Sequence, residues 1–169
     1  MGLRGRRSID EFRQGDLPIP DQRRKQAKAL LSELDEVQTE LVQLLALLDR
    51  PARGSVLLRA HSAAQDASQA LEQLRLAQIL VHMGAVSDID RQEDEPQIRF
   101  TGAYFARVLR ENLDADTRVQ RHRKIAEALA GRRRRSASIE LATHLIGAQL
   151  LLQAYPVLIN AARRAARAN

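Results

Sequence analysis

The amino-acid sequence predicts a mainly α fold, in which a winged helix is followed by an array of antiparallel TPR-like helices. Hydrophobic residues make up 44% of the 169 positions but aromatics only 3%, so the core must be built from aliphatic side chains. Apolar residues recur at helical spacing over most of the chain. Three such helices precede a short β-type hairpin, which is the element order of a winged helix, a variant of the helix-turn-helix.

The first 20 residues predict a flexible basic lead. Four arginines and two glycines fall in the first thirteen positions, and no helical period is present. Pro18 and Pro20 then set an extended entry to the next segment. We therefore place the winged-helix domain at residues 21–100 and the helical array, as a truncated one, at residues 101–169.

Two helices open the winged-helix domain. Asp21 is expected to cap the first and Asp35 the second, because a carboxylate there accepts the free amide hydrogens of the first turn. The first helix has apolar positions at Ala27, Leu30, Leu31 and Leu34. The second has them at Val37, Leu41, Leu44, Leu45 and Leu48.

A short helix, a longer helix and a hairpin complete this domain. The short helix carries Val56, Leu57 and Ala60, and Asp66 with Gln69 forms a capping-box pattern that should open the longer one. Residues 79–81 and 86–90 are expected to be β, with residues 97–100 as their partner. The loop 88–95 would then be the wing.

Four helices are predicted after residue 100. Asp114 and Asp116 occupy capping positions between the first two, and Phe100, Tyr104 and Phe105 should lie where the wing meets the array. The first two helices have inward positions at Tyr104, Phe105, Val108, Leu109 and Leu113, then at Val119, His122, Ile125, Ala126 and Leu129. Helices at 139–152 and 154–166, after a basic loop at 131–135, have theirs at Leu141, Ala142, Leu145, Ile146 and Gln149, then at Val157, Leu158, Ala161, Ala162 and Ala165.

The motif residues of this central stretch also carry a family resemblance. They are Leu17 to Asp21, Leu34-Asp35, Arg99-Phe100, Tyr104-Phe105, Arg107-Val108-Leu109, Asn112-Leu113 and the run 121–129. The pattern resembles the region after the nucleotide-binding core of STAND-type signal-transduction ATPases, such as LuxR-family regulators and ATPase-fused kinases and cyclases. The usual His-Pro pair of that family is replaced here by Gly102-Ala103. The resemblance implies a non-catalytic regulatory module whose winged helix clamps the nucleotide-binding core and whose helices dock a partner.

The sequence carries no enzyme signature. Lys25, Lys28 and Lys124 lack the preceding glycines of a phosphate-binding loop, so we expect no ATP hydrolysis and no cofactor. The four histidines lack the spacing of a helical metal site, and His122 and His144 should be packed, neutral side chains. There is no cysteine, no signal-type apolar core and no membrane-length apolar run, so we expect a cytoplasmic protein without membrane contact.

DNA binding is the alternative function. A helix-turn-helix normally places its second helix in the major groove, where Gln69, Gln73 and Arg75 would be the contacting residues. The net charge of +6 would favour binding to DNA. Affinity for DNA depends on neutralising phosphates, however, and an acidic wing would repel them. The acidic wing residues are Asp88, Asp90, Glu93, Asp94 and Glu95. We therefore expect the wing to contact a protein, either a nucleotide-binding domain in cis or a separate chain, and we disfavour DNA.

Overall fold

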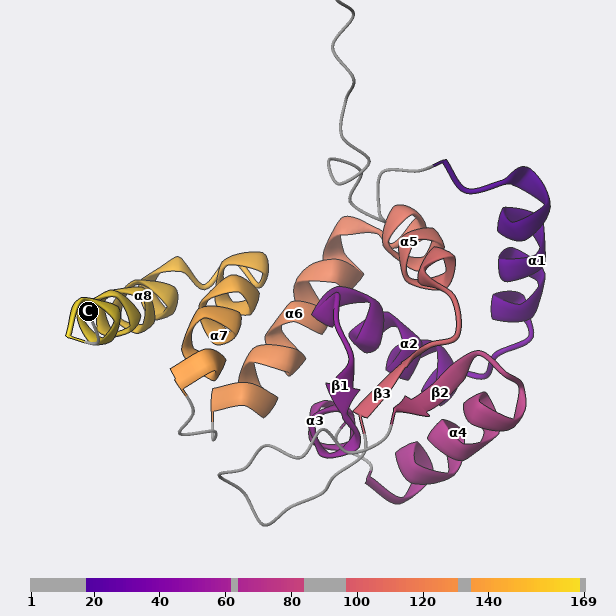
Figure 1. The fold of residues 1–169 in the computed structure, drawn as a ribbon, viewed down its shortest axis with the longest axis horizontal. Coiled ribbons are helices and arrows are strands. Elements are labelled where there is room, and N and C mark those ends of the chain that lie inside the picture. The colour runs from indigo at the N-terminus through magenta and orange to yellow at the C-terminus, as the bar shows by residue number, and fades with distance from the viewer. Residues whose placement is uncertain (1–17, 62–63, 84–96, 131–134, 168–169) are drawn as a thin grey trace, which may run out of the picture.

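The computed structural model describes residues 18–61, 64–83, 97–130 and 135–167, and over these residues the fold is mainly α, as predicted (Figure 1). The helices are α1 Asp21–Ser32, α2 Glu36–Leu48, α3 Gly54–Ala60, α4 Ala64–Leu76, α5 Ala103–Asn112, α6 Ala115–Ala130, α7 Arg135–Gly147 and α8 Leu151–Ala166. The strands are β1 Ala52–Arg53, β2 Leu80–Met83 and β3 Gln97–Phe100.

The predicted helix caps are partly confirmed. Asp35 and Gln38 form a reciprocal capping box at the start of α2, and the Asp114 carboxylate accepts the Thr117 amide at 2.8 Å. The caps predicted at Asp21, Asp66 and Asp116 are wrong, because each of these residues lies inside the first turn of its helix. Their carboxylates still favour the helix, since a negative charge opposes the positive end of the helix dipole.

The three strands form one antiparallel sheet in the order β1-β3-β2. Leu80 pairs with Phe100 and Met83 with Gln97, which confirms the predicted pairing of these two segments. Sequence reasoning missed β1, because a two-residue strand has no periodicity to detect. The predicted strand at 86–90 and the wing loop 88–95 lie outside the described residues.

One hydrophobic core runs through α1 to α6 and the sheet. The helices α5 and α6 both pack against α2, and α6 also contacts α3, so the core continues across residue 100. Phe105 is 2% exposed, and its ring lies 4.5 Å from that of Tyr104 and 6.2 Å from that of Phe100. The three aromatics thus gather where β3 leads into α5, but that a wing meets a helical array at this point stays a prediction. The division into domains at residue 100 stays a prediction.

The last helices extend away from this body. In Figure 1, α6, α7 and α8 stand side by side, and α8 lies at the end of the molecule opposite α1. A second, small core joins them, made by Ala126, Leu145 and Ala154. Ala154 is the one buried residue of α8 in the described part of the chain, whereas α2 buries five larger apolar side chains and Ala46, so α8 is held by much less apolar burial than α2.

The turn between α7 and α8 differs from the prediction. One helix was expected from 139 to 152, but α7 ends at Gly147 and α8 begins at Leu151. Gln149 has a left-handed φ of 60°, while the amides of Gln149 and Leu150 donate to the carbonyls of Ile146 and Leu145. This is the Schellman arrangement, which usually has glycine at the left-handed position. With glutamine there, the sequence offered no sign of the break.

Candidate protein-docking surface

The inner face of α8 packs on α7. Ala154 is buried in the small core, and Val157 and Leu150 pack at its edge. The prediction that Leu158, Ala162 and Ala165 also point inward is wrong, because all three are exposed. The same correction applies to Ile146 on α7 and to Gln149 in the turn that follows. No described element covers them.

An apolar stripe lies on one flank of α8. Leu151, Leu152, Tyr155 and Leu158, which we call the α8 stripe, are 63%, 93%, 67% and 41% exposed. Residues 151, 155 and 158 follow the i, i+4, i+7 spacing of a single helix face, and residue 152 lies beside them. Single exposed apolar side chains are ordinary, but four together on one helix indicate a surface that another molecule covers.

The sequence did contain an indication of this stripe. Eight of the ten residues from 150 to 159 are apolar, whereas a helix with one buried face needs about half as many. Such a wide apolar arc on a helix means that a second face is available for contact. In the sequence-based prediction only Val157 and Leu158 of these residues lie on an inward face, and Leu151, Leu152 and Tyr155 are assigned to none.

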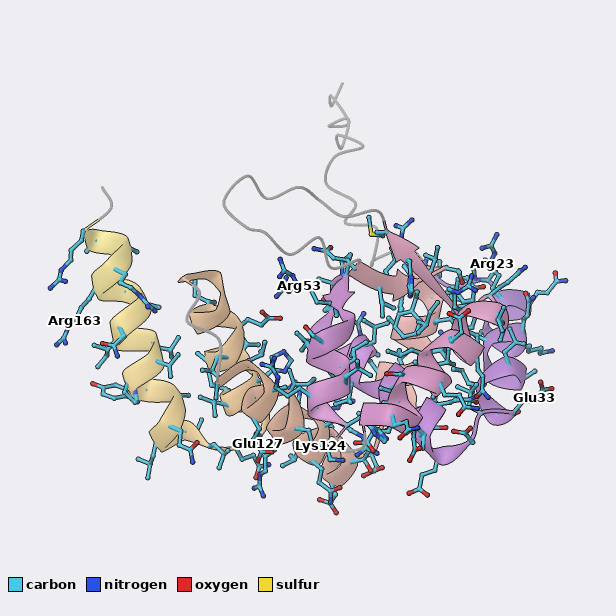
Figure 2. All side chains as sticks on the ribbon, turned by 90° about the horizontal axis from the view of Figure 1, so that it is seen from below. Arg23, Glu33, Arg53, Lys124, Glu127 and Arg163 are labelled. Carbon is cyan, nitrogen blue, oxygen red and sulfur yellow. The ribbon has the colours of Figure 1, made fainter. Side chains whose placement is uncertain are left out.

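The C-terminal half of α8, beyond Leu158, is polar and basic. Asn160, Arg163, Arg164 and Arg167 line a shallow hollow there, and Figure 2 shows Arg163 projecting from α8 away from the other helices. The sequence has no aspartate or glutamate after Glu140, so Arg163 and Arg167 have no carboxylate of their own helix beside them. Helix α8 therefore carries an apolar stripe followed by a positive C-terminal end.

A pair of histidines connects α6 to α7, on which α8 rests. The Nδ1 atoms of His122 and His144 lie 2.9 Å apart, so one must donate and the other accept, and the two rings cannot both be protonated. Burial is the main cause that lowers the pKa of His144, and His122 and Arg50 lower it further, to about 4. Burial and Arg118 lower the pKa of His122. The predicted packed histidine is confirmed for His144, whereas His122 is only partly buried.

Gly147 is required beside this histidine pair. A Cβ at this position would lie 2.6 Å from the His122 ring, well inside van der Waals contact. The close approach of α6 and α7 therefore depends on a residue without a side chain. This contact sets where α7, and with it α8, can lie.

A group of charged side chains fixes α6 to the main body. The Glu40 carboxylate accepts hydrogen bonds from Arg121 at 3.0 Å and from Lys124, and it lies 3.5 Å from His61 Nε2. Arg121 also donates to Gln43 at 3.0 Å. These residues join α2, the end of α3 and α6. Within the described ranges no group of three histidine, cysteine, aspartate or glutamate residues could hold a metal ion. We therefore interpret the cluster as a structural contact that holds α6 against α2 and α3.

Two of the three candidate DNA-contacting residues are already engaged on the protein's own surface. Gln73 accepts a hydrogen bond from the Gln38 side chain at 2.7 Å, and Arg75 forms an ion pair with Glu72 on the same helix. Gln69 is exposed on α4. The structure brings Gln69, Gln73 and Arg75 together on α4, but the five acidic wing residues lie outside the described part of the chain.

Comparison with known proteins gives no relative for this chain. No protein-family model matches it, no curated protein matches it, and no solved structure matches it. Among the described helices, none is both long and apolar enough to cross a membrane.

Proposed function

We propose that the chain is a non-catalytic regulatory module that works by protein contact, with the α8 stripe as its docking surface. The exposure of Leu151, Leu152, Tyr155 and Leu158 on one flank of a single helix is the observation that carries this proposal. Covering one large apolar side chain is worth about 1.5–3 kcal/mol, so a partner has a favourable surface to bind.

In this proposal residues 21–100 are a winged helix and the following helices are a TPR-like array. The helices α2, α3 and α4, followed by an antiparallel sheet in the order β1-β3-β2, support the first assignment. The packing of α6 on α7 and of α7 on α8 supports the second. The resemblance to STAND-type ATPases then suggests a cytoplasmic role, with a nucleotide-binding domain in cis or a separate chain as the partner.

DNA binding is the competing function, and the contacts of α4 disfavour it. A recognition helix needs free donors and acceptors for base edges and free cations for phosphates. Here Gln73 is bonded to Gln38 and Arg75 is paired with Glu72. Breaking both contacts would be an added cost of docking this helix in a groove.

Site-specific photo-crosslinking tests the docking surface. A photo-reactive amino acid replaces Leu152 in one version of the chain and Lys28, an exposed residue of α1, in the matched control. In cells that make the chain, we expect discrete protein adducts from position 152 and none of the same mass from position 28.

Duplex DNA binding provides the opposing outcome. Sequence-selective binding at physiological salt, lost in the triple variant Gln69→Ala, Gln73→Ala and Arg75→Ala, would replace this proposal with a DNA-binding regulator. Weak binding that is steeply salt-dependent and unchanged in the triple variant agrees with protein contact, because it reflects only net positive charge.

A further inference from the structure

We propose that the α8 stripe binds one amphipathic helix with acidic flanks, supplied by a partner protein. This inference rests on the proposed function and specifies the chemistry of the partner. It follows from the shape of the stripe and from the charges beside it.

The stripe has the dimensions of a helix-binding site. Residues 151 to 158 cover two turns of α8, about 10 Å along its axis. Leu152 is the most exposed of the four at 93%, Tyr155 and Leu151 follow at 67% and 63%, and Leu158 is 41% exposed. A second helix packed along this flank would insert its own apolar residues at i, i+3 or i+4, and i+7, which is the common way a helical surface takes a helical partner.

The charges beside the stripe determine which kind of partner helix can bind. Arg163 and Arg167 lie about one and a half and two and a half turns beyond Leu158, and no carboxylate is present on α8 to neutralise them. A partner helix with aspartate or glutamate flanking its apolar face would pair with these guanidinium groups at the rim of the contact. A basic helix with the same apolar face would meet like charge and bind more weakly.

A second copy of the chain fits this surface less well. Two α8 helices would bring two sets of arginines to one interface, on chains that each carry a net charge of +6. The stripe is also small compared with the surface that stable dimers bury, so the contact should be transient. We therefore expect a separate, acidic partner and micromolar affinity.

A displayed library of helical peptides, balanced between acidic and basic members, tests this inference. Peptides are selected on the full chain and counter-selected on the double variant Leu152→Ser and Tyr155→Ser, whose changes lie at exposed positions and whose folding is checked by thermal melting. We expect the enriched peptides to combine helix-spaced apolar residues with net negative charge. Synthetic copies should bind in fluorescence anisotropy, about tenfold or more weaker to the double variant.

A charge variant tests the acidic preference separately. Arg163→Gln with Arg167→Gln should weaken binding of the selected peptides about three- to tenfold at low salt and little at high salt. Lys25→Gln with Lys28→Gln removes the same charge from α1 and should leave binding unchanged.

Several results would overturn the inference. Enriched peptides that are neutral or basic would do so, as would a selection that enriches nothing over the double variant. A dimer in light scattering that the double variant abolishes would assign the stripe to a second copy, which removes the acidic helix but keeps protein docking. Binding to anionic lipid vesicles, lost in the double variant, would contradict both the inference and the proposed function.

Discussion

The helices before and after residue 130 bury their apolar side chains to different extents. From α1 to α6, leucine, isoleucine, valine and phenylalanine side chains fill one continuous core. In α7 and α8 the core is reduced to Leu145 and small neighbours, while the largest apolar side chains of α8 face outward. The first region uses its apolar residues for stability, whereas the second leaves its largest ones exposed, which is where we propose that a partner binds. Substitutions that separate these two uses are the sharpest tests.

The largest effect is expected from truncating the aromatic junction in the first region. Phe105→Ala removes a fully buried ring and should lower the free energy of unfolding by about 3–5 kcal/mol, because both burial and packing are lost. In a chain of this length the thermal midpoint should fall on the order of 10 °C. Tyr155→Ala on α8 is the matched control and should change the melt little. Equal effects of the two substitutions would contradict the comparison.

The second effect concerns the charged cluster that holds α6. Glu40→Gln leaves Arg121 and Lys124 without their shared carboxylate in a partly buried place and should cost about 1–3 kcal/mol. Chemical denaturation at low and high salt measures it, and the cost should persist at high salt because the cluster is shielded from solvent. Glu72→Gln, which breaks the exposed pair with Arg75, should cost less than 1 kcal/mol.

The third effect depends on pH and reports on the contact between α6 and α7. Burial lowers the pKa of His144 from 6.5 to about 4, so between these values the unfolded chain binds a proton that the folded chain does not. The free energy of unfolding should therefore fall as the pH falls from 6.5 toward 4, by up to about 1.4 kcal/mol per pH unit from this residue. Well above pH 6.5 His144 is neutral in both states and contributes no pH dependence.

Variants can isolate the histidine contribution. His144→Leu should make the slope between pH 6.5 and 4 shallower, whereas His82→Gln, which changes an exposed histidine, should leave it unchanged. Urea unfolding at a series of pH values measures both. The same slope in His144→Leu and in the unmodified chain would mean that the buried pair does not titrate as described.

The smallest effect on stability is expected at the α8 stripe. Leu152→Ser should change the free energy of unfolding by no more than about 0.5 kcal/mol, because the side chain is 93% exposed. Its effect should appear instead in partner binding. A large loss of stability in this variant would show that the stripe is covered within the folded chain.

The fold was more predictable from the sequence than the site. Helices with one apolar face, such as α2 with its Asp35 cap, carry both a period and a start signal. The ends of helices were harder to predict, because the left-handed residues that follow α4 and α7 are Gln78 and Gln149 and not glycine. Pattern alone gives no indication of a left-handed glutamine, since the hydrogen bonds that hold it are formed only in the folded chain.

The docking surface could not be located from periodicity alone. A period shows that Leu158 and Leu151 share a face of α8, but not whether another helix covers that face. Likewise, the sequence placed Gln69, Gln73 and Arg75 on one helix but did not show their contacts. The hydrogen bond between Gln73 and Gln38 depends on how α2 and α4 pack. The ion pair of Arg75 with Glu72 depends on the rotamers of the two side chains. Which apolar face is left uncovered is a property of tertiary packing.

The continuity of the core across residue 100 has a consequence for synthesis of the chain. Leu41 and Leu44 of α2 share their core with Ile125 and Leu129 of α6, more than 80 positions later. A chain emerging from its N-terminus must therefore keep apolar side chains of α2 uncovered until α6 has been made, because the contacts that bury them are distant in sequence. The interval before residue 130 appears is the period in which the nascent protein is most exposed to aggregation and most dependent on chaperones.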